Sequence, residues 1–364
     1  MVHEAAPPAQ VKKRSWRGAA ACSPLPPRAL GICLDKGGNM PGILSRRLLL
    51  AAAPSLALAS VARAQSWPNG SIRLVVPFAP GGSTDIAARF LADGLSQRLG
   101  VTVVVENRAG AGATTGSQVV ADAAPDGQTL VMSNIASHAI SPTLYGNRVR
   151  YNPVSSFSHI AMVITNPSVW VVNKDSGINS LADLVRMAKG KQGGLDMASS
   201  GAGSSNHLLI VRFCQQNNID FTHVPFRGAG PAMQAVIAGQ VPMMSDSLPS
   251  AAAHIRQGSV RAIAMSSAER HPSFPEVPTF REAGFDLVST SWFALSGPAG
   301  MPAAIVQRLN RETRDFVSTP AAQARFAELG GTAGDMTPEE FTAFVAAEVE
   351  RWAPVVRASG ATVN

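Results

Sequence analysis

Short continuous apolar runs alternate along the chain with segments whose apolar residues have helical spacing. The first run, residues 72–78, predicts a buried strand, and residues 83–99 predict a helix. Further strands are predicted at 101–106 and 129–133, with a helix at 114–123 between them. Because strands and helices alternate, we expect a parallel sheet with right-handed crossovers.

The alternation resumes after two extended runs, 157–163 and 169–173. Predicted strands lie at 195–198, 221–225, 241–244 and 260–265, and predicted helices at 181–189, 204–217, 231–238 and 248–257. The last predicted elements are an extended run at 288–295 and helices at 302–317 and 339–358.

This order predicts an α/β fold with two lobes, each a mostly parallel sheet flanked by helices. The chain is expected to leave the first lobe near residue 167 and to return near 289, so that two crossing segments form a hinge. The expected lobes are therefore 65–167 plus 289–364, and 168–288.

Two glycine-rich loops each join a predicted strand to a predicted helix. They are Pro80-Gly81-Gly82-Ser83-Thr84-Asp85 and Ser199-Ser200-Gly201-Ala202-Gly203-Ser204-Ser205-Asn206. Unpaired N–H groups and the positive end of the helix dipole favour an anion at such a junction. Ligands of parallel sheets bind beyond the carboxyl ends of the strands. We therefore expect the two loops to face each other across a cleft and to hold a carboxylate.

Side chains near predicted strand ends are candidates for choosing among carboxylates: Phe78, Asn134, Ser137, His138, Arg227 and Asp246. Arg227 fits pairing with a second ligand carboxylate, or bracing of its own loop. Asp246 is suited to three roles: accepting a hydrogen bond from a ligand amine, bonding to a ligand hydroxyl, or bonding to the other lobe in the closed state. Asp85 fits ligand binding, or stabilisation of the first helical turn.

Sequence patterns for catalysis, metals and cofactors are missing. The second loop has no G-x-S-x-G elbow, and His207, His223 and His254 lack metal-ligand spacing. Gly110-Ala111-Gly112 with Gly116 has the wrong spacing for a dinucleotide fingerprint. We therefore expect no cofactor, no metal ion and no enzymatic activity.

The net charge of +7 is concentrated near the N-terminus. Nine of the 31 lysines and arginines, but only two of the 24 acidic residues, lie in residues 1–64, so the later residues carry 22 of each. A segment with no net charge gives no electrostatic reason to bind nucleic acid or an anionic membrane.

Residues 40–64 have the parts of an export signal. Arg46-Arg47 forms the basic part, residues 48–61 are almost entirely apolar, and Ala62-Arg63-Ala64 is a cleavage motif. The apolar run is shorter than a membrane span. We expect export to the periplasm, by the Sec or the twin-arginine route, with cleavage after Ala64.

Residues 1–39 are proline-rich, basic and without a pattern. We interpret them as a disordered or mis-assigned extension, with translation starting at Met40. Cys22 and Cys33 fall in this extension, so Cys214 is left without a disulfide partner and is expected to be a small core residue.

Five motifs, taken in order, carry a family resemblance. They are Pro77-Phe78-Ala79-Pro80-Gly81-Gly82-Ser83-Thr84-Asp85, Val105-Glu106-Asn107-Arg108-Ala109-Gly110-Ala111-Gly112, Pro125-Asp126-Gly127-Gln128-Thr129-Leu130, Pro225-Phe226-Arg227-Gly228 and Pro231-Ala232. In this order they resemble the Bug (TctC-like) proteins, periplasmic solute receptors related to tripartite tricarboxylate transporters. The resemblance extends over residues 66–364.

The resemblance implies a type II periplasmic-binding-protein fold and a small carboxylate ligand that is delivered to a membrane permease. It also implies that backbone amides, small hydroxyls and water hold the carboxylate. The matching positions here are Pro80, Gly81, Gly82, Ser83, Thr84 and Asp85 in the first lobe, and residues 199–205 in the second, where the nominated contacts are Ser199, Ser200, Gly201, Gly203, Ser204 and Ser205. Ala79, next to the first loop, is nominated as a further ligand contact.

We therefore expect a monomeric receptor that carries out no chemistry. Two alternatives remain open at this point. One is a periplasmic enzyme acting on carboxylates, and the other is a ligand sensor whose closed form contacts a signalling partner such as a sensor kinase.

Overall fold

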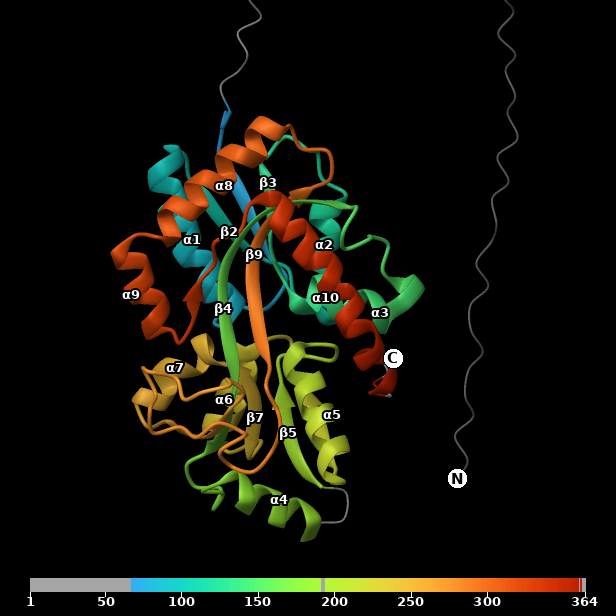
Figure 1. Ribbon diagram of the computed structural model, residues 1–364, viewed down its shortest axis with the longest axis vertical. Helices are drawn as coiled ribbons and strands as arrows, with labels where there is room; N and C mark the ends of the chain where they lie inside the picture. Colours follow the sequence, from blue (N-terminus) through green and yellow to red (C-terminus); the bar gives the residue numbers. More distant parts are fainter. Residues whose placement is uncertain (1–66, 191–193, 360, 362–364) are drawn as a thin grey trace, which may run out of the picture. The chain divides into compact units, whose positions relative to one another are not determined.

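The computed structural model describes residues 67–190, 194–359 and 361. The expected extension, the export signal and the cleavage site after Ala64 lie outside these residues. Among the helices of the described ranges, none is both long enough and apolar enough to cross a membrane. The described chain forms two α/β lobes (Figure 1), as the sequence predicts.

The first lobe is built on a mixed sheet. β1 (Ile72–Val76) lies between β2 (Val103–Asn107) and β3 (Thr129–Asn134) and pairs with both in parallel. It occupies this position because all its apolar side chains are fully buried. β9 (Thr290–Pro298) then pairs antiparallel with β3 and with the first part of β4 (Phe157–Asn173).

The second lobe repeats the parallel arrangement. β5 (Leu195–Ser199) lies between β6 (Phe221–Pro225) and β7 (Met243–Ser247) and pairs with both in parallel. The later part of β4 pairs antiparallel with β7 and with β8 (Val260–Met265).

β4 is one strand of 17 residues, where the sequence predicted two separate runs. It pairs with β9 up to Pro167 and with β7 from Ser168 onward, so it passes from one sheet into the other (Figure 1). The return segment before β9 is the second crossing. We keep residues 168–288 as the proposed second lobe.

The helices cover the faces of both sheets (Figure 1). The α-helices are α1 (Ser83–Leu99), α2 (Thr114–Ala121), α3 (Ser141–Tyr145), α4 (Leu181–Gly190), α5 (Ser205–Asn217), α6 (Ala229–Ile237), α7 (Leu248–Arg256), α8 (Ala303–Val317), α9 (Pro320–Glu328) and α10 (Pro338–Ala358). Shorter elements are η1 (Ala111–Ala113), the π-helical η2 (Ala136–Ile140), η3 (Gly146–Arg148) and β10 (Thr332–Ala333). The sequence did not predict α3, α9 or any of these shorter elements.

The predicted start of the last helix is confirmed. The Thr337 side chain accepts a hydrogen bond from the backbone N–H of Glu340, and the Glu340 side chain accepts one from the N–H of Thr337. α10 then packs its buried Phe341, Val345 and Trp352 against the first lobe.

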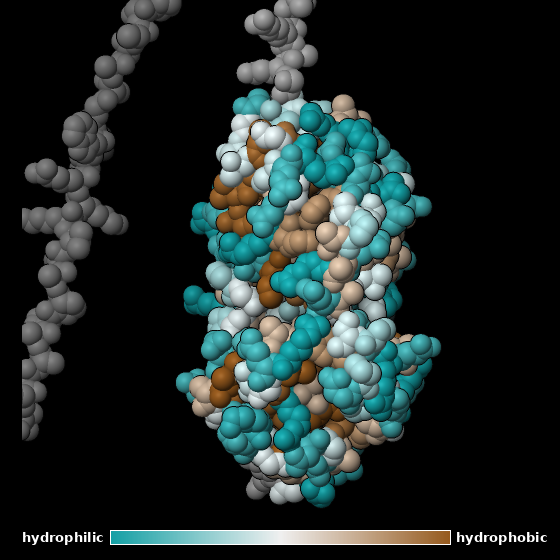
Figure 2. All heavy atoms as spheres, turned by 90° about the vertical axis from the view of Figure 1, so that its left-hand side faces the viewer, coloured by the Kyte–Doolittle hydropathy of each residue, from teal (hydrophilic) through white to brown (hydrophobic). Residues whose placement is uncertain are grey.

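The face shown in Figure 2 is mostly polar, with small separate apolar groups. Among the described residues, Val104 on β2 is the one large apolar side chain classed as exposed, at 49%.

Candidate functional site

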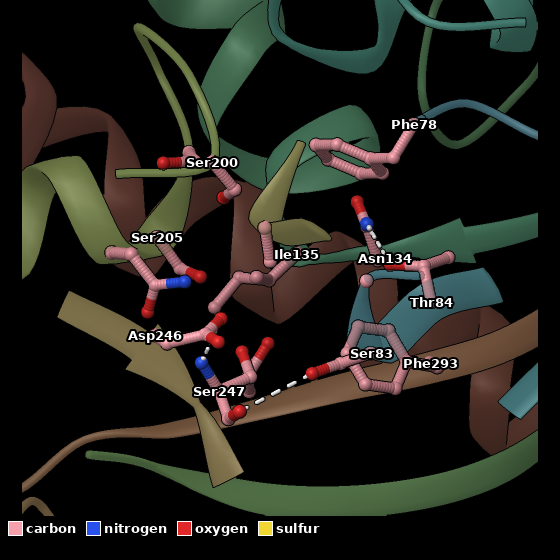
Figure 3. A pocket seen from close by; sticks show the side chains of 15 residues that line it. Phe78, Ser83, Thr84, Asn134, Ile135, Ser200, Ser205, Asp246, Ser247 and Phe293 are labelled. Atoms are coloured by element: carbon pink, nitrogen blue, oxygen red, sulfur yellow. Dashed lines mark hydrogen bonds between the residues drawn. The ribbon is translucent and has the colours of Figure 1, made fainter. Parts of the chain in front are cut away.

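Two helices begin at one small cavity, one from each lobe (Figure 3). α1 contributes Gly82, Ser83 and Thr84 to its lining, and α5 contributes Ser205 and Asn206. In the described part of the chain, no protein acceptor is found for the backbone N–H groups of these five residues. The first turn of each helix therefore offers donors to whatever fills the cavity.

The cavity has a volume of about 30 Å³, enough to admit at least one water molecule. Asn134, Phe78 and Phe293 close it from the first lobe, and Asp246 and Ser247 close it from the second (Figure 3). The cavity is one part of a larger space, because it shares lining residues with a wider groove.

Direct hydrogen bonds join the two lobes beside the cavity. Ser83 Oγ lies 2.8 Å from Ser250 Oγ and accepts a hydrogen bond from the Ser250 backbone N–H at 3.0 Å. The Ala79 N–H donates to the Arg227 carbonyl at 3.1 Å. Helix α7 lacks a side-chain cap from its own N-cap residue, so Ser83 of the other lobe supplies an acceptor for its first turn.

Asp246 is a fully buried carboxyl group on the cavity wall. It accepts hydrogen bonds from the Ser247 N–H at 2.7 Å and the Ser250 hydroxyl at 2.6 Å. Burial raises the pKa of Asp246 to about 7, although these two bonds act in the opposite direction. The group is therefore partly neutral near pH 7, which reduces its repulsion of an anion in the cavity.

Asp85 braces its own loop rather than lining the cavity. Its carboxylate accepts the Gly81 N–H at 3.0 Å and the Asn107 amide at 2.9 Å, and it pairs with Arg89. Burial raises the pKa of Asp85, but the bonds from Arg89, Gly81 and Asn107 outweigh burial and lower it overall. Gly81 has φ of +82°, a conformation that favours glycine.

The structure brings together about half of the residues that the sequence nominated. Those that line the cavity are Phe78, Gly82, Ser83, Thr84, Asn134, Ser200, Ser204, Ser205 and Asp246. Those that do not are Ala79, Pro80, Gly81, Asp85, Ser137, His138, Ser199, Gly201, Gly203 and Arg227.

Ser137 and His138 lie in the core beneath Asn134, away from the cavity. The Ser137 hydroxyl bonds to the Asn134 backbone, and His138 Nδ1 lies 2.8 Å from Ser137 Oγ. The His138 ring packs against Phe157 with a centroid distance of 4.5 Å. Burial, with a smaller contribution from His159, holds the pKa of His138 well below its ordinary value.

Six cavity residues were not among the nominated contacts: Ile135, Asn206, Ala229, Ser247, Ser291 and Phe293. Three had a local signal, because Ile135 and Ser247 directly follow nominated residues and Asn206 is the last residue of the predicted second loop. Ser291 and Phe293 had none, because β9 reaches the cavity only through its antiparallel pairing with β3 and β4.

A wider groove of about 450 Å³ adjoins the cavity, and Phe78, Ser200 and Ser204 line both. Glycine-rich segments of both lobes form its other walls, together with Tyr145 and the exposed Arg227. In the described part of the chain, Arg227 makes no ion pair.

Comparisons with known proteins agree with this geometry. The family model described as "Tripartite tricarboxylate transporter family receptor" matches residues 87–361. The chain belongs to this receptor family. The resemblance drawn from the motifs is thereby confirmed, and the protein is a periplasmic solute-binding receptor.

Individual relatives are similar over most of their length. BugT of Bordetella pertussis is 35% identical, over 84% of this chain and 94% of BugT. The solved structure of the periplasmic binding protein BugD has a TM-score of 0.78 at 31% identity, over 81% of this chain and 99% of BugD. The expected periplasmic-binding-protein fold is therefore confirmed.

Two further solved structures contain carboxylates. Rpa4515 of R. palustris, solved with adipate, has a TM-score of 0.79 at 30% identity, over 82% of this chain and 100% of its own. MatC (Rpa3494) of Rhodopseudomonas palustris, solved with malate, has a TM-score of 0.76 at 32% identity, over 80% of this chain and 100% of MatC.

Proposed function

We propose that this receptor captures a small organic carboxylate between its lobes and delivers it to a membrane permease of the tripartite tricarboxylate transporter type. The observation that carries the proposal is the convergence of two helix starts, α1 and α5, on one cavity. Two relatives solved with dicarboxylates support the ligand class.

The charge of the ligand is held by main chain. In the described part of the chain, no lysine or arginine lines the cavity. Each charge-assisted hydrogen bond from a backbone N–H contributes roughly 1.5–3 kcal/mol, so two or three such bonds hold a carboxylate without a cationic side chain.

A second acidic group of the ligand would extend into the groove. The cavity and the groove share Phe78, Ser200 and Ser204, and Arg227 lines the groove but not the cavity. Dicarboxylates therefore fit the proposed site better than monocarboxylates do, because both of their charges have partners.

Ligand binding also selects the closed form. Helix α1 and helix α5 belong to different proposed lobes, so the donor set is complete only when the lobes approach. The ligand stabilises the closed form through contacts that the open form cannot make.

Export, oligomeric state and the fate of the ligand complete the proposed function. We propose that the chain is exported by a cleaved signal ending at Ala64, acts as a monomer and leaves its ligand chemically unchanged. In the described ranges, no group of three His, Cys, Asp or Glu side chains is arranged to hold a metal ion.

A thermal-shift screen of mono-, di- and tricarboxylates against the chain from Gln65 onward tests the proposal. A ligand at 100 times its dissociation constant adds about 2.7 kcal/mol of stability, so a true ligand raises the melting temperature by several degrees. Mass spectrometry of the recovered acid checks that it is unchanged. Absence of any stabilising acid, or sustained turnover, contradicts the proposal.

A further inference from the structure

The second-lobe loop is held by two histidine rings that do not line the cavity. His207 lies in the first turn of α5, and His223 lies on β6. The rings are stacked, with centroids 3.9 Å apart and an interplanar angle of 14°. Both line a separate surface pocket of about 360 Å³.

Each ring makes one hydrogen bond to the loop. His207 Nδ1 accepts the Gly203 N–H at 3.2 Å, and His223 Nε2 lies 2.6 Å from Ser199 Oγ. Ser199 Oγ in turn accepts the Gly201 N–H at 3.2 Å. The two rings therefore fix the loop at its start, after β5, and at its end, before α5.

The loop ends in a left-handed glycine and lies beside a surface pocket. Gly203 has φ of +78°, and it directly precedes the N-cap residue Ser204. A surface pocket, rather than close-packed apolar core, adjoins the two histidine rings. On its other side the same loop contributes Ser200 and Ser204 to the cavity.

The charge state of the rings fits this role. Burial lowers the pKa of His207 to about 4, and burial together with His207 lowers the pKa of His223 to about 3. A neutral His207 has a lone pair on Nδ1 that can accept the Gly203 N–H. Two charged rings at this separation would repel each other.

We propose that His207 and His223 are positioning residues, which hold residues 199–204 in the conformation that presents the Ser200 and Ser204 hydroxyls and the first α5 N–H groups to the ligand. Neither histidine contacts the ligand in this proposal. The role rests on the proposed function, because it is defined by the cavity on the opposite side of the loop.

Paired substitutions separate positioning from general packing. His207→Leu removes the Nδ1 acceptor but keeps an apolar side chain of similar size. His207→Asn keeps an acceptor oxygen bonded to Cγ, where Nδ1 is attached in histidine. His223→Leu and His223→Gln form the corresponding pair for Nε2. His254→Leu is the control, because His254 is on α7 of the same proposed lobe and bonds to no other described side chain.

The first measurement is the dissociation constant for the tightest-binding acid of the screen. We expect about tenfold weaker binding for each leucine variant, and values within about twofold of wild type for His207→Asn, His223→Gln and the control. Wild-type affinity in the leucine variants overturns the proposal, as does an equal loss in the leucine and amide variants.

The second measurement is amide hydrogen exchange of residues 199–206 without ligand. It requires no ligand, so it tests the loop even where the screen finds no acid and the proposed function fails. Faster exchange in the leucine variants, reversed in the amide variants, supports the positioning role, and unchanged exchange overturns it. If His207→Leu does not fold, His207→Gln replaces it, because Gln places its acceptor one bond too far from the backbone.

Discussion

The two cavity loops share one geometry but use different chemistry. In each, the side chain at the third helical position accepts the N–H of the residue before the N-cap. Asp85 accepts from Gly81 in the first lobe, and His207 accepts from Gly203 in the second. The first acceptor is a carboxylate paired with Arg89, and the second is a neutral imidazole stacked on another ring.

This difference determines the conditions under which each loop loses its supporting hydrogen bond. The Asp85 brace is charged and has a lowered pKa, so it survives mild acid but depends on its partners Arg89 and Asn107. The His207 brace carries no charge, so it adds no field beside the ligand. It depends on the ring remaining neutral.

Removing the charged brace should have the largest effect. Asp85→Ala leaves the Gly81 N–H, the Asn107 amide and Arg89 without their shared acceptor. We expect a loss of about 2 kcal/mol in the free energy of unfolding, since the buried Asp85 is the shared acceptor of these groups although Arg89 itself is half exposed, together with loss of carboxylate binding. Urea denaturation and calorimetry measure the two effects.

Asp93→Ala on the same helix is the matched control, because Asp93 is exposed. A loss below about 1 kcal/mol for Asp85→Ala, within the range of an exposed pair, would show that the brace is dispensable.

Acid should weaken the second loop before the first. The neutral His207 ring stabilises the fold fully above the ordinary histidine pKa of 6.5, and this contribution declines by about 1.4 kcal/mol per pH unit as the pH falls toward 4. Asp85 has a lowered pKa, so its contribution is complete above 3.8 and is lost only at lower pH. Between neutral pH and pH 5, the protection of backbone amides from hydrogen exchange should therefore decrease more at residues 199–204 than at residues 80–84.

Amides of β1 control for global opening, because the buried His138 and His159 of the first lobe also have lowered pKa values. Simultaneous loss of protection in both loops and in β1 would contradict a local difference between the loops.

On the second-lobe side of the cavity, the charged group is the carboxyl of Asp246, whereas the His207 brace of the loop is neutral. Its raised pKa, about 7, means that the folded state holds this proton below pH 7 and loses it as the pH rises. The affinity for an anionic ligand should therefore fall above pH 7, by at most about tenfold per pH unit. Asp246→Asn should make the affinity independent of pH between 6 and 8.5 in calorimetric titrations. A pH dependence that persists in this variant would remove Asp246 from the explanation.

The parts of this site that sequence could predict are local. The glycines, the small hydroxyls and the helix start of each loop are consecutive residues, so the two loops and the fold class followed from pattern and motif order. The two braces could not be recognised in the same way. From sequence alone Asp85 fits two interpretations, because Asn107, which shares its carboxylate, lies on a different strand, β2.

The remaining misses are non-local. His207 and His223 showed no metal-ligand spacing, and only the parallel pairing of β5 with β6 brings His223 next to Ser199. Ser137 and His138 were misplaced because a π-helical turn after β3 directs their side chains into the core. β9 reaches the cavity from the far end of the chain, after the whole second lobe.

The first hydroxyl of each helix also differs between the lobes. Ser83 bonds to Ser250 across the closed interface, whereas the Ser205 hydroxyl has no partner among the described residues. Ser83→Ala should weaken binding of all ligands about fivefold, since an N-cap type bond contributes about 1 kcal/mol to the closed form. Ser205→Ala should instead weaken only those acids whose carboxylate it contacts. Equal effects of Ser83→Ala and Ser205→Ala across the acid panel would argue against separate roles.

The smallest expected effect concerns the cations beside the groove. In the first lobe Arg108, next to the groove residue Ala109, is paired with Glu106, whereas Arg227 in the second lobe has no ion pair in the described chain. Arg227→Ala should weaken dicarboxylates about threefold, the effect of an exposed pair, and leave monocarboxylates unchanged. Arg212→Ala is the control, because Arg212 is exposed on α5 and does not line the groove. If mono- and dicarboxylates weaken equally, Arg227 supports its own loop and the second carboxylate binds elsewhere.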